Sequence, residues 1–298
     1  MKRRTFVNTT ALCAVAVSAS GFIRYDGSRY VGDCETTTDI LGPFYRPGSP
    51  VRQDMVVAGD ASPIIELKGV VYHKDCVTPY KNAKVELWHC SGEGVYDNTS
   101  DQFLFRSTGY TDSQGNYSFR TNLPVPYDIG EGNFRPAHFH MMISAAGYIP
   151  LVTQLYFAGD PNIEKDPSSS SPLAKRRILD VEILRNLTQR VVYNVGMSDS
   201  ILVEPESIKK LTGAYVDEND PASTLEFFED NKALWLKSEI YGNNLDYVGN
   251  NTFLFGGDSP DSGYSLRFEI MKKGAVRLIF TMPDDKGGST AQTFLKKK

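Results

Sequence analysis

Short apolar segments separated by turn residues recur along this chain and limit the folds that it can adopt. Residues 64–73 and 83–90 are two examples. The alternation in Lys84–Trp88 has the period of two that is typical of a strand with one buried face. Asp112 and Gly115 supply turn chemistry between two further strand-like segments. The spacing of these segments predicts an antiparallel β-sandwich.

A second strand-like series begins after residue 204. It follows a polar stretch at 165–177 that is rich in Ser and Pro and that predicts a loop or linker. The series has tight polar turns and contains neither His nor Cys, so we predict a small β-barrel at 204–298 without a catalytic role. A chain ending near residue 200 is therefore expected to fold and function alone. The segment 176–195 is left open between helix and strand.

The N-terminus resembles an export signal. Its first 20 residues combine a basic start, a short apolar stretch and small residues suited to cleavage. Arg3 and Arg4, followed by Phe6, are compatible with twin-arginine export and with a Sec signal that has chance arginines. No later segment has the ~18 uninterrupted apolar residues of a membrane span. We expect a soluble protein that is periplasmic or secreted.

Three cysteines, Cys34, Cys76 and Cys90, remain once that signal is removed. In an oxidising compartment, one disulfide and one free thiol is the simplest arrangement, and the pairing is left open. Zinc held by cysteines is disfavoured, because the chain has no Cys-x-x-Cys pair. The net charge of -4, with both signs interspersed, disfavours nucleic acid as a partner.

Two of the four histidines, His138 and His140, lie one residue apart in an expected strand. Side chains at i and i+2 of a strand share a face, so both imidazoles should point to one place. Burying two imidazoles is costly unless their lone pairs are used. The pair therefore indicates a metal site, although by itself it fits several metals, zinc included. His73 and His89 are expected to be structural or loop residues.

Two tyrosines are candidates for further ligands. Tyr96 follows two glycines in "GEGVY", and Tyr127 follows two prolines in "PVPY". A phenol has a pKa near 10 and coordinates weakly unless a highly charged cation removes its proton. Hard Fe(III) prefers anionic oxygen, so two His and two Tyr suit ferric iron. Spacing alone does not select these two from the 16 tyrosines.

The blocks "ILGPFYRPGSP", "VELWHCSGEGVYDN", "PVPYDIGEGNFRPAHFH" and "LVTQLYFAGDP" resemble the intradiol ring-cleavage dioxygenases, the group that contains catechol and protocatechuate 3,4-dioxygenases. The resemblance covers roughly residues 34–162. It implies that residues 30–200 form an all-β catalytic domain, a prealbumin-like antiparallel sandwich with Fe(III) as cofactor. The implied reaction uses O2 to cleave a catechol-type ring between its two hydroxylated carbons, giving a muconate-type product. The second series instead resembles small β-barrels appended to penicillin-recognising hydrolases.

The resemblance also implies roles for individual residues. Tyr127 corresponds to the ligand that leaves iron and acts as a base when catechol arrives, and Arg135 to the arginine that stabilises negative charge on the substrate. The catechol-cleaving members usually have an N-terminal helical dimerisation domain, and too few residues precede "LGPFYRP" here to form one; a homo-oligomer is left open. The implied iron ligands are Tyr96, Tyr127, His138 and His140, and the implied pocket residues are Ile40, Pro43, Tyr45, Arg135 and Gln154.

Two functions of other classes stay open at this point. One is a secreted prealbumin-like binding module whose His-x-His is incidental or holds a structural metal. The other is a zinc-dependent hydrolase. Neither should be coloured, whereas tyrosinate bound to Fe(III) absorbs visible light.

Overall fold

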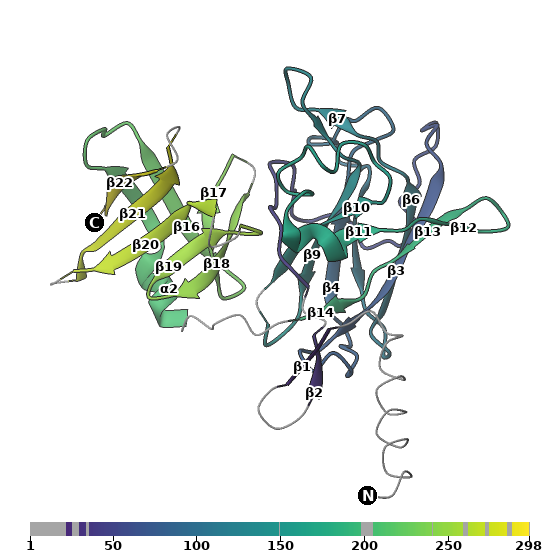
Figure 1. The fold of residues 1–298 in the computed structure, drawn as a ribbon, viewed down its shortest axis with the longest axis horizontal. Helices are drawn as coiled ribbons and strands as arrows, with labels where there is room; N and C mark the ends of the chain where they lie inside the picture. Colours follow the sequence, from purple (N-terminus) through teal and green to yellow (C-terminus); the bar gives the residue numbers. More distant parts are fainter. Residues whose placement is uncertain are drawn as a thin grey trace, which may run out of the picture.

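The computed structural model describes residues 22–25, 30–33, 36–148, 150–197, 205–239, 241–258, 262–271, 274–284 and 288–297. The expected export signal and Cys34 lie outside these residues. Two all-β bodies lie side by side, a sandwich and a closed barrel (Figure 1), which confirms the predicted fold class. None of the helices in the described ranges has the length and apolar character needed to cross a membrane.

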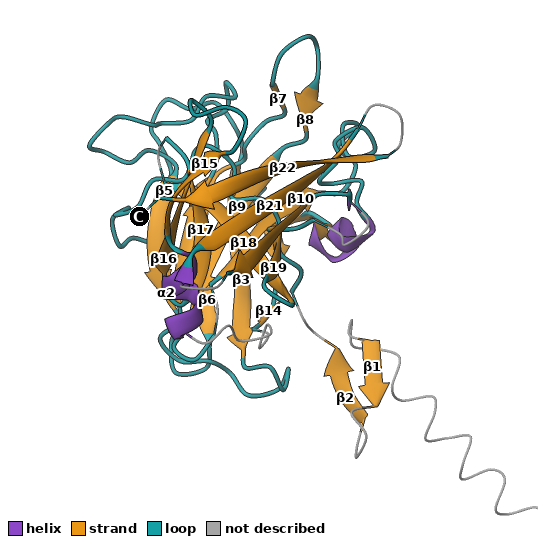
Figure 2. Cartoon of the chain, turned by 90° about the vertical axis from the view of Figure 1, so that its left-hand side faces the viewer, coloured by secondary structure: helices purple, strands orange, loops and turns teal. Residues whose placement is uncertain are grey.

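Two sheets form the sandwich. The first has the strand order β11-β10-β9-β4-β5, and the second has the order β12-β13-β3-β14, with β6 also paired to β3. β1 with β2, and β7 with β8, form two separate two-stranded antiparallel sheets, here called ribbons (Figure 2). The bounds are β1 (Phe22–Tyr25), β2 (Tyr30–Asp33), β3 (Ile64–Tyr72), β4 (Lys84–Trp88), β5 (Arg106–Tyr110), β6 (Asn116–Asn122), β7 (Tyr127–Asp128), β8 (Phe134–Arg135), β9 (His138–Ser144), β10 (Leu151–Phe157), β11 (Ile178–Leu179), β12 (Glu182–Ile183), β13 (Gln189–Val192) and β14 (Val195–Gly196).

From Ile178 onward the segment 176–195 forms short strands, and some of them depart from the predicted antiparallel pattern. β11 runs parallel to β10, while β13 and β14 run parallel to β3. Parallel neighbours need a crossover connection of about a dozen residues or more. The polar stretch provides one between β10 and β11; it is a packed loop that contains the 3-10 helix η1 (Pro172–Arg177).

Alternation along β9 separates the core from the functional face. Phe139, Met141 and Ile143 point into the hydrophobic core between the two sheets. His138 and His140 therefore lie on the outer face of the first sheet. They are nevertheless buried, at 1% exposure each, because loops and the barrel cover that face.

The barrel closes through eight antiparallel strands, and the helix α2 (Pro205–Leu211) packs against them. Its core is rich in aromatic rings from several strands, such as Tyr215, Phe227 and Phe268. One strand, β18, lies in a segment that sequence patterning did not single out. The bounds are β15 (Gly213–Asp217), β16 (Thr224–Asp230), β17 (Ala233–Lys237), β18 (Gly242–Gly249), β19 (Thr252–Phe255), β20 (Ser265–Ile270), β21 (Val276–Pro283) and β22 (Ser289–Lys296).

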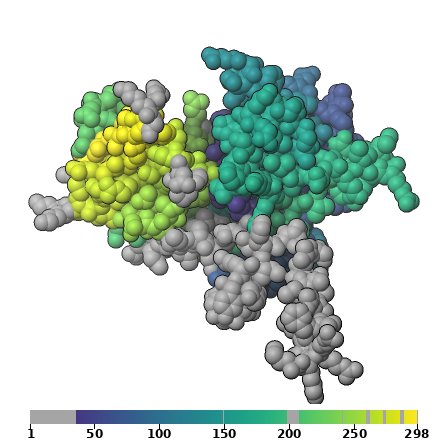
Figure 3. All heavy atoms as spheres, in the orientation of Figure 1, coloured from purple at the N-terminus to yellow at the C-terminus, as the bar shows by residue number. Residues whose placement is uncertain are grey.

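The barrel packs directly against the outer face of the first sheet (Figure 3). The contact also includes hydrogen bonds from Thr38 Oγ1 to Asp246 Oδ2 (2.6 Å) and from Gly257 N to Thr38 Oγ1 (3.0 Å). A chain ending near residue 200 would expose apolar side chains that the full chain buries, and its independent folding and activity stay a prediction. The shared hydrophobic cluster, here called the interface cluster, contains Leu41, Tyr45, Trp88, Cys90, Tyr96, Met142, Val152, Ala233 and Trp235, with Phe44, Tyr127, Phe228 and Tyr241 packed against it.

Candidate metal centre

Three of the four predicted ligands place their donor atoms around one point. The Nε2 atoms of His138 and His140 are 3.0 Å apart. The Tyr96 hydroxyl lies 3.4 Å from the first and 3.1 Å from the second. Metal–nitrogen bonds are about 2 Å long, so donors that share one ion lie about 3 Å from each other. The triangle is therefore the right size for a single metal ion.

Tyr127 joins this group from the ribbon β7–β8. Its ring centroid is 5.6 Å from that of Tyr96 and 5.7 Å from that of His138. Gly94 lets the two tyrosine-bearing segments come this close. It has a φ of +77°, and a Cβ there would lie 2.9 Å from the Tyr127 Cβ. A side chain at residue 94 would push the segments apart.

Electrostatics keep both imidazoles neutral. Burial, followed by the nearby Arg135 guanidinium, lowers the pKa of His138 to about 3. Burial and the neighbouring His138 hold the pKa of His140 well below its ordinary value. Neutral imidazole is the form that binds a metal through a ring nitrogen.

The phenols, by contrast, are held protonated unless a cation is bound. Burial, followed by the neighbouring Tyr127, raises the pKa of Tyr96 well above its usual value. Burial also raises the pKa of Tyr127, while Arg135 and a hydrogen bond with Tyr96 act against that rise. A highly charged metal ion would reverse the balance at both hydroxyls.

The hydrogen bonds of the two histidines fit a metal at the triangle. His138 Nδ1 lies 2.7 Å from the Pro136 carbonyl. A carbonyl can only accept, so Nδ1 carries the proton and Nε2 presents its lone pair. His140 Nδ1 is buried without a hydrogen-bond partner. A cation at the triangle would use the Nε2 lone pair of His138 and, with the proton on Nδ1, that of His140; the two Nε2 atoms lie 3.0 Å apart.

Packing fixes the His140 ring. Trp88 stacks on it, with ring centroids 5.1 Å apart and planes 6° from parallel. The two residues are cross-strand partners of β4 and β9, which accounts for the alignment. Gly42 lies on the Ile40–Tyr45 segment, and a Cβ there would be 3.2 Å from the His140 Cε1 atom.

Arg135 lies beside the centre, held by a polar network. It is the cross-strand partner of Tyr127 in the ribbon β7–β8. Its Nε forms an ion pair with Asp166, and its Nη2 donates to Gln154 Oε1 over 2.8 Å. Gln154 in turn donates to the Ile40 carbonyl (2.7 Å). The network therefore fixes Arg135, Gln154 and the Ile40 backbone relative to one another.

Known proteins with similar sequences show the family to which this chain belongs. A family model described as Dioxygenase matches residues 40–199, more than half of the chain. The chlorocatechol 1,2-dioxygenase of Rhodococcus opacus is 32% identical over 158 residues, which cover 45% of this chain and 61% of that protein. The catechol 1,2-dioxygenase of Candida albicans is 35% identical over 151 residues, or 44% of this chain and 50% of that protein.

This chain belongs to the intradiol dioxygenase family. The crystal structure of catechol 1,2-dioxygenase from Pseudomonas arvilla C-1 is also similar. Its TM-score is 0.51 at 26% identity, and the match covers 58% of this chain and 64% of that one. The matched region thus spans between half and two thirds of these relatives. The barrel lies beyond the residues that the family model matches.

The five predicted pocket residues do not all lie beside the candidate metal centre. Ile40 and Gln154 belong to the network around Arg135, and Pro43 is exposed. The Tyr45 ring packs between Trp88 and Tyr241, with ring centroids 5.0 Å from each. The Tyr45 hydroxyl donates to Glu86 Oε1 over 3.2 Å. The structure therefore places Tyr45 at the contact with the barrel.

Three buried residues beneath the network were missed by the sequence analysis. Tyr156 donates to Asp39 Oδ2 (3.0 Å) and to Gln154 Oε1 (3.1 Å), and Arg177 forms an ion pair with Asp39. Strand alternation could have identified Tyr156, since it lies two residues from Gln154 on β10. Arg177 follows another arginine in a polar stretch, which gave no sign that it would be 1% exposed.

The other histidines and the cysteines have structural partners. His73 Nδ1 lies 2.8 Å from the Tyr148 hydroxyl. His89 bonds the Cys90 carbonyl (2.7 Å) and the Thr121 hydroxyl (2.8 Å). Cys76 is disulfide-bonded, whereas Cys90 is a free, buried thiol.

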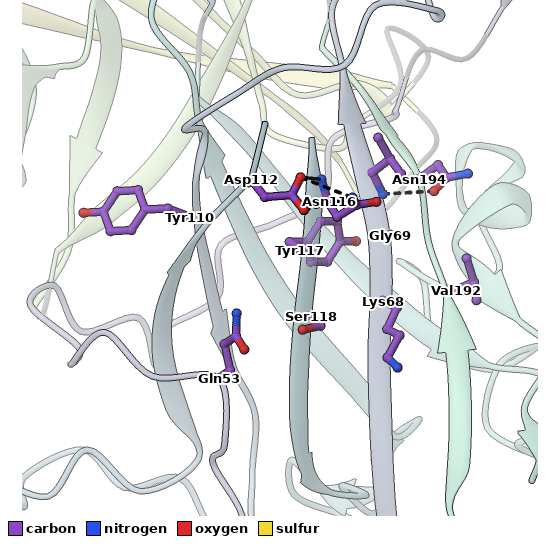
Figure 4. Close-up of a pocket in the computed structure, with 11 residues that line it drawn as sticks. Gln53, Lys68, Gly69, Tyr110, Asp112, Asn116, Tyr117, Ser118, Val192 and Asn194 are labelled. Atoms are coloured by element: carbon purple, nitrogen blue, oxygen red, sulfur yellow. Dashed lines mark hydrogen bonds between the residues drawn. The ribbon is translucent and has the colours of Figure 1, made fainter. Parts of the chain in front are cut away.

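No other place in the described structure offers a comparable centre. Among the residues described, no three His, Cys, Asp or Glu side chains gather as metal ligands. A polar groove of about 500 Å³, lined by Lys68, Ser118 and Asn194, lies on the outer face of the second sheet (Figure 4). The sandwich core separates this groove from the four donors. Its Asn194 is already bonded to the Val70 amide, at 3.0 Å.

Proposed function

We propose that this chain is a non-haem, Fe(III)-dependent intradiol dioxygenase. It would use O2 to cleave a catechol-type ring between the two hydroxylated carbons, giving a muconate-type diacid. The observation that carries the proposal is the triangle of His138, His140 and Tyr96 donor atoms, with edges of 3.0 to 3.4 Å, against which Tyr127 packs. Two relatives named for catechol or chlorocatechol 1,2-dioxygenation support the reaction class.

The donor chemistry favours ferric iron over zinc. Two phenols become strong anionic donors only beside a highly charged cation, and hard Fe(III) prefers such oxygens. Catalytic zinc sites usually have three His, Cys or carboxylate ligands, and the described residues contain no such group. When bound, ferric iron would supply a Lewis acid that draws electron density from the catecholate and prepares the ring to react with O2.

Tyr127 is the residue best placed to accept a substrate proton. It is less buried than Tyr96, which is 8% exposed and contacts both histidine nitrogens. With ferric iron bound, Tyr127 would be a phenolate, and it would accept the proton of one catechol hydroxyl and become a neutral phenol, as a positioned general base does. Tyr96, fixed between the histidines and stacked on Phe44, would stay in place.

Arg135 would stabilise negative charge that develops on the substrate. Its guanidinium is already oriented by Asp166 and Gln154, so little reorganisation is needed during the reaction. Preorganised cations in a site with little water are effective in this role. The segment from Ile40 to Phe44 covers the histidine side of the centre and limits the access of water there.

Visible spectroscopy of the iron-loaded protein tests the proposal. Tyrosinate bound to Fe(III) should give a coloured protein with one iron per chain, and anaerobic addition of catechol should shift the band. Admission of O2 should then consume one O2 per catechol and yield a muconate-type product. Active preparations that contain zinc, or that stay colourless with iron, would contradict the assignment. A binding module would bind without O2 uptake.

The same proposal includes export to the periplasm or the medium. The basic start and small residues of the first 20 positions support it, as does the disulfide at Cys76, which requires an oxidising compartment to persist. The mass of the mature protein, recovered from the exported fraction, tests this part.

A further inference from the structure

A series of ring contacts connects the barrel to the metal centre. Tyr241 of the barrel packs edge-on against Tyr45, with ring centroids 5.0 Å apart and planes at 71°. Tyr45 contacts Trp88 at 5.0 Å, and Trp88 stacks on His140 at 5.1 Å. Three contacts thus connect a barrel side chain to a candidate iron ligand.

Hydrogen bonds anchor the two tyrosine rings in this series, whereas Trp88, whose buried Nε1 has no hydrogen-bond partner, is held by packing. Tyr45 and Trp88 are 5% and 2% exposed. The Tyr45 hydroxyl bonds Glu86, and the Tyr241 hydroxyl bonds Asp230. Behind Tyr241, the barrel supplies Trp235 at 5.3 Å and Phe228 at 5.4 Å. A buried ring with an anchored hydroxyl has one orientation, so the contacts are geometrically specific.

His140 depends on this packing more than His138 does. Metal-bound histidines usually donate their second N–H to an acceptor that fixes the ring. His138 has such an acceptor in the Pro136 carbonyl, whereas His140 Nδ1 is buried without one. Its ring is instead located by the indole of Trp88 on β4 and by the Gly42 segment. Packing supplies the orientation that a hydrogen bond supplies to His138.

We propose that Tyr241 of the barrel is a positioning residue for His140, acting through Tyr45 and Trp88. The barrel is then part of the metal centre's support and not an appended module. The inference rests on the proposed function, since it requires that the centre bind ferric iron. Loss of the Tyr241 ring should let Tyr45 and Trp88 relax toward the vacated space, which removes the support of the His140 plane.

The test compares three variants of the full-length ferric protein: Tyr241→Ala, Tyr241→Phe and Tyr264→Ala. The measured quantities are the rate of iron loss to a competing chelator and the position of the visible band, with far-UV circular dichroism as a folding check. Tyr241→Ala should lose iron about 10-fold faster and show a shifted band, which is the size of effect expected when support of a ligand is removed. Tyr241→Phe keeps the ring, so its rate of iron loss and the position of its visible band should match those of wild type. Tyr264→Ala removes a half-exposed barrel ring whose ring partner is Phe255, so it should match wild type.

A folded Tyr241→Ala protein with the wild-type band and rate of iron loss would overturn the inference. If that variant is insoluble, Tyr241→Val, which also removes the ring and leaves most of its space empty but keeps an apolar side chain, takes its place under the same criteria. A wild-type protein that binds no ferric iron would defeat the proposed function itself, and the inference with it. If the wild-type protein binds ferric iron and the Tyr241 variant behaves like it, only the inference is defeated. The two failures can therefore be distinguished.

Discussion

Tyr127 and Arg135 lie directly opposite one another as cross-strand partners in the ribbon β7–β8. The ribbon thereby places a candidate base and a permanent cation next to each other at the edge of the centre. Burial raises the pKa of Tyr127, and Arg135 opposes that rise. The same two residues would take a proton from the substrate and stabilise the charge that its removal creates.

Substitution of the two tyrosines should have different consequences. Tyr127→Phe should keep iron but bind catechol slowly, because it removes the base. Its visible spectrum with saturating catechol should be close to wild type, since Tyr127 would have left the metal in that complex. Tyr96→Phe removes the donor that contacts both Nε2 atoms, so it should weaken iron retention and alter the spectrum even with catechol bound. The opposite pattern would show that the two roles are reversed.

Replacement of Arg135 should slow turnover without loss of iron. In Arg135→Met, kcat should fall about 100-fold, the size of effect seen when one charge-stabilising group is removed. The number of iron atoms per chain should stay at one. Arg120→Met is the matched control, because Arg120 pairs with Asp54 on the surface. Steady-state kinetics with equal iron loading make the comparison, and equal kcat values for both variants would refute the role of Arg135.

Alanine substitutions at two glycines with similar backbone conformations can separate steric effects at the metal centre from backbone strain. Gly42 has a φ of +73° and lies near His140, whereas Gly48 has a φ of +85° and would place a Cβ with nothing within 4 Å of it. An alanine at either position should cost about 1–2 kcal/mol of stability, because both adopt a left-handed conformation. Only Gly42→Ala should also speed iron loss to a chelator. Equal rates of iron loss in the two variants would show that Gly42 does not support His140.

The stability of the iron-free protein should fall in mild acid partly because of His89. Burial lowers the pKa of His89 to about 4, from an ordinary value of 6.5. Between these values the unfolded chain binds a proton that the folded chain does not. The free energy of unfolding should therefore decrease as the pH falls from 6.5 to about 4, by about 1.4 kcal/mol per pH unit from this residue.

Urea denaturation at several pH values checks this expectation. His89→Gln can still donate and accept hydrogen bonds toward Cys90 and Thr121, but it does not titrate. The variant should show a shallower decrease in stability than wild type over the same pH range. Parallel decreases in the two proteins would mean that the pH dependence comes from other groups.

The sequence predicted the parts of this molecule that depend on local pattern. The period of two in β9 placed His138 and His140 on one face. Most of the longer strands likewise fall in the short apolar segments that the sequence analysis identified. β18 was missed because Gly242–Gly249 contains Gly, Asn and Asp, residues that are depleted in strands. Its place in a closed barrel, between two neighbours, supplies the hydrogen bonds that local propensity did not predict.

Long-range contacts account for what the sequence could not show. Tyr96 and Tyr127 were singled out by resemblance, since no pattern distinguishes them among the tyrosines. Asp39 and Arg177 form a buried ion pair across 138 positions of the chain. The contact of Tyr45 with the barrel could not be predicted for the same reason: its position depends on Tyr241, which belongs to the other body. No local signal in the sequence reports a partner at such a separation.

The turn that joins β7 to β8 gives this chain a place where its substrate range can change. Ile129 is 62% exposed there, and Gly130 and Gly132 have open space around them. Tyr127 and Arg135 are fixed at the base of this projecting hairpin (Figure 2). If the proposed function holds, changes in the length or side chains of residues 129–133 would alter the surface next to the centre and leave Tyr127 and Arg135 where they are. Diversity introduced at these five positions is therefore the most direct route to variants that accept larger or differently substituted rings.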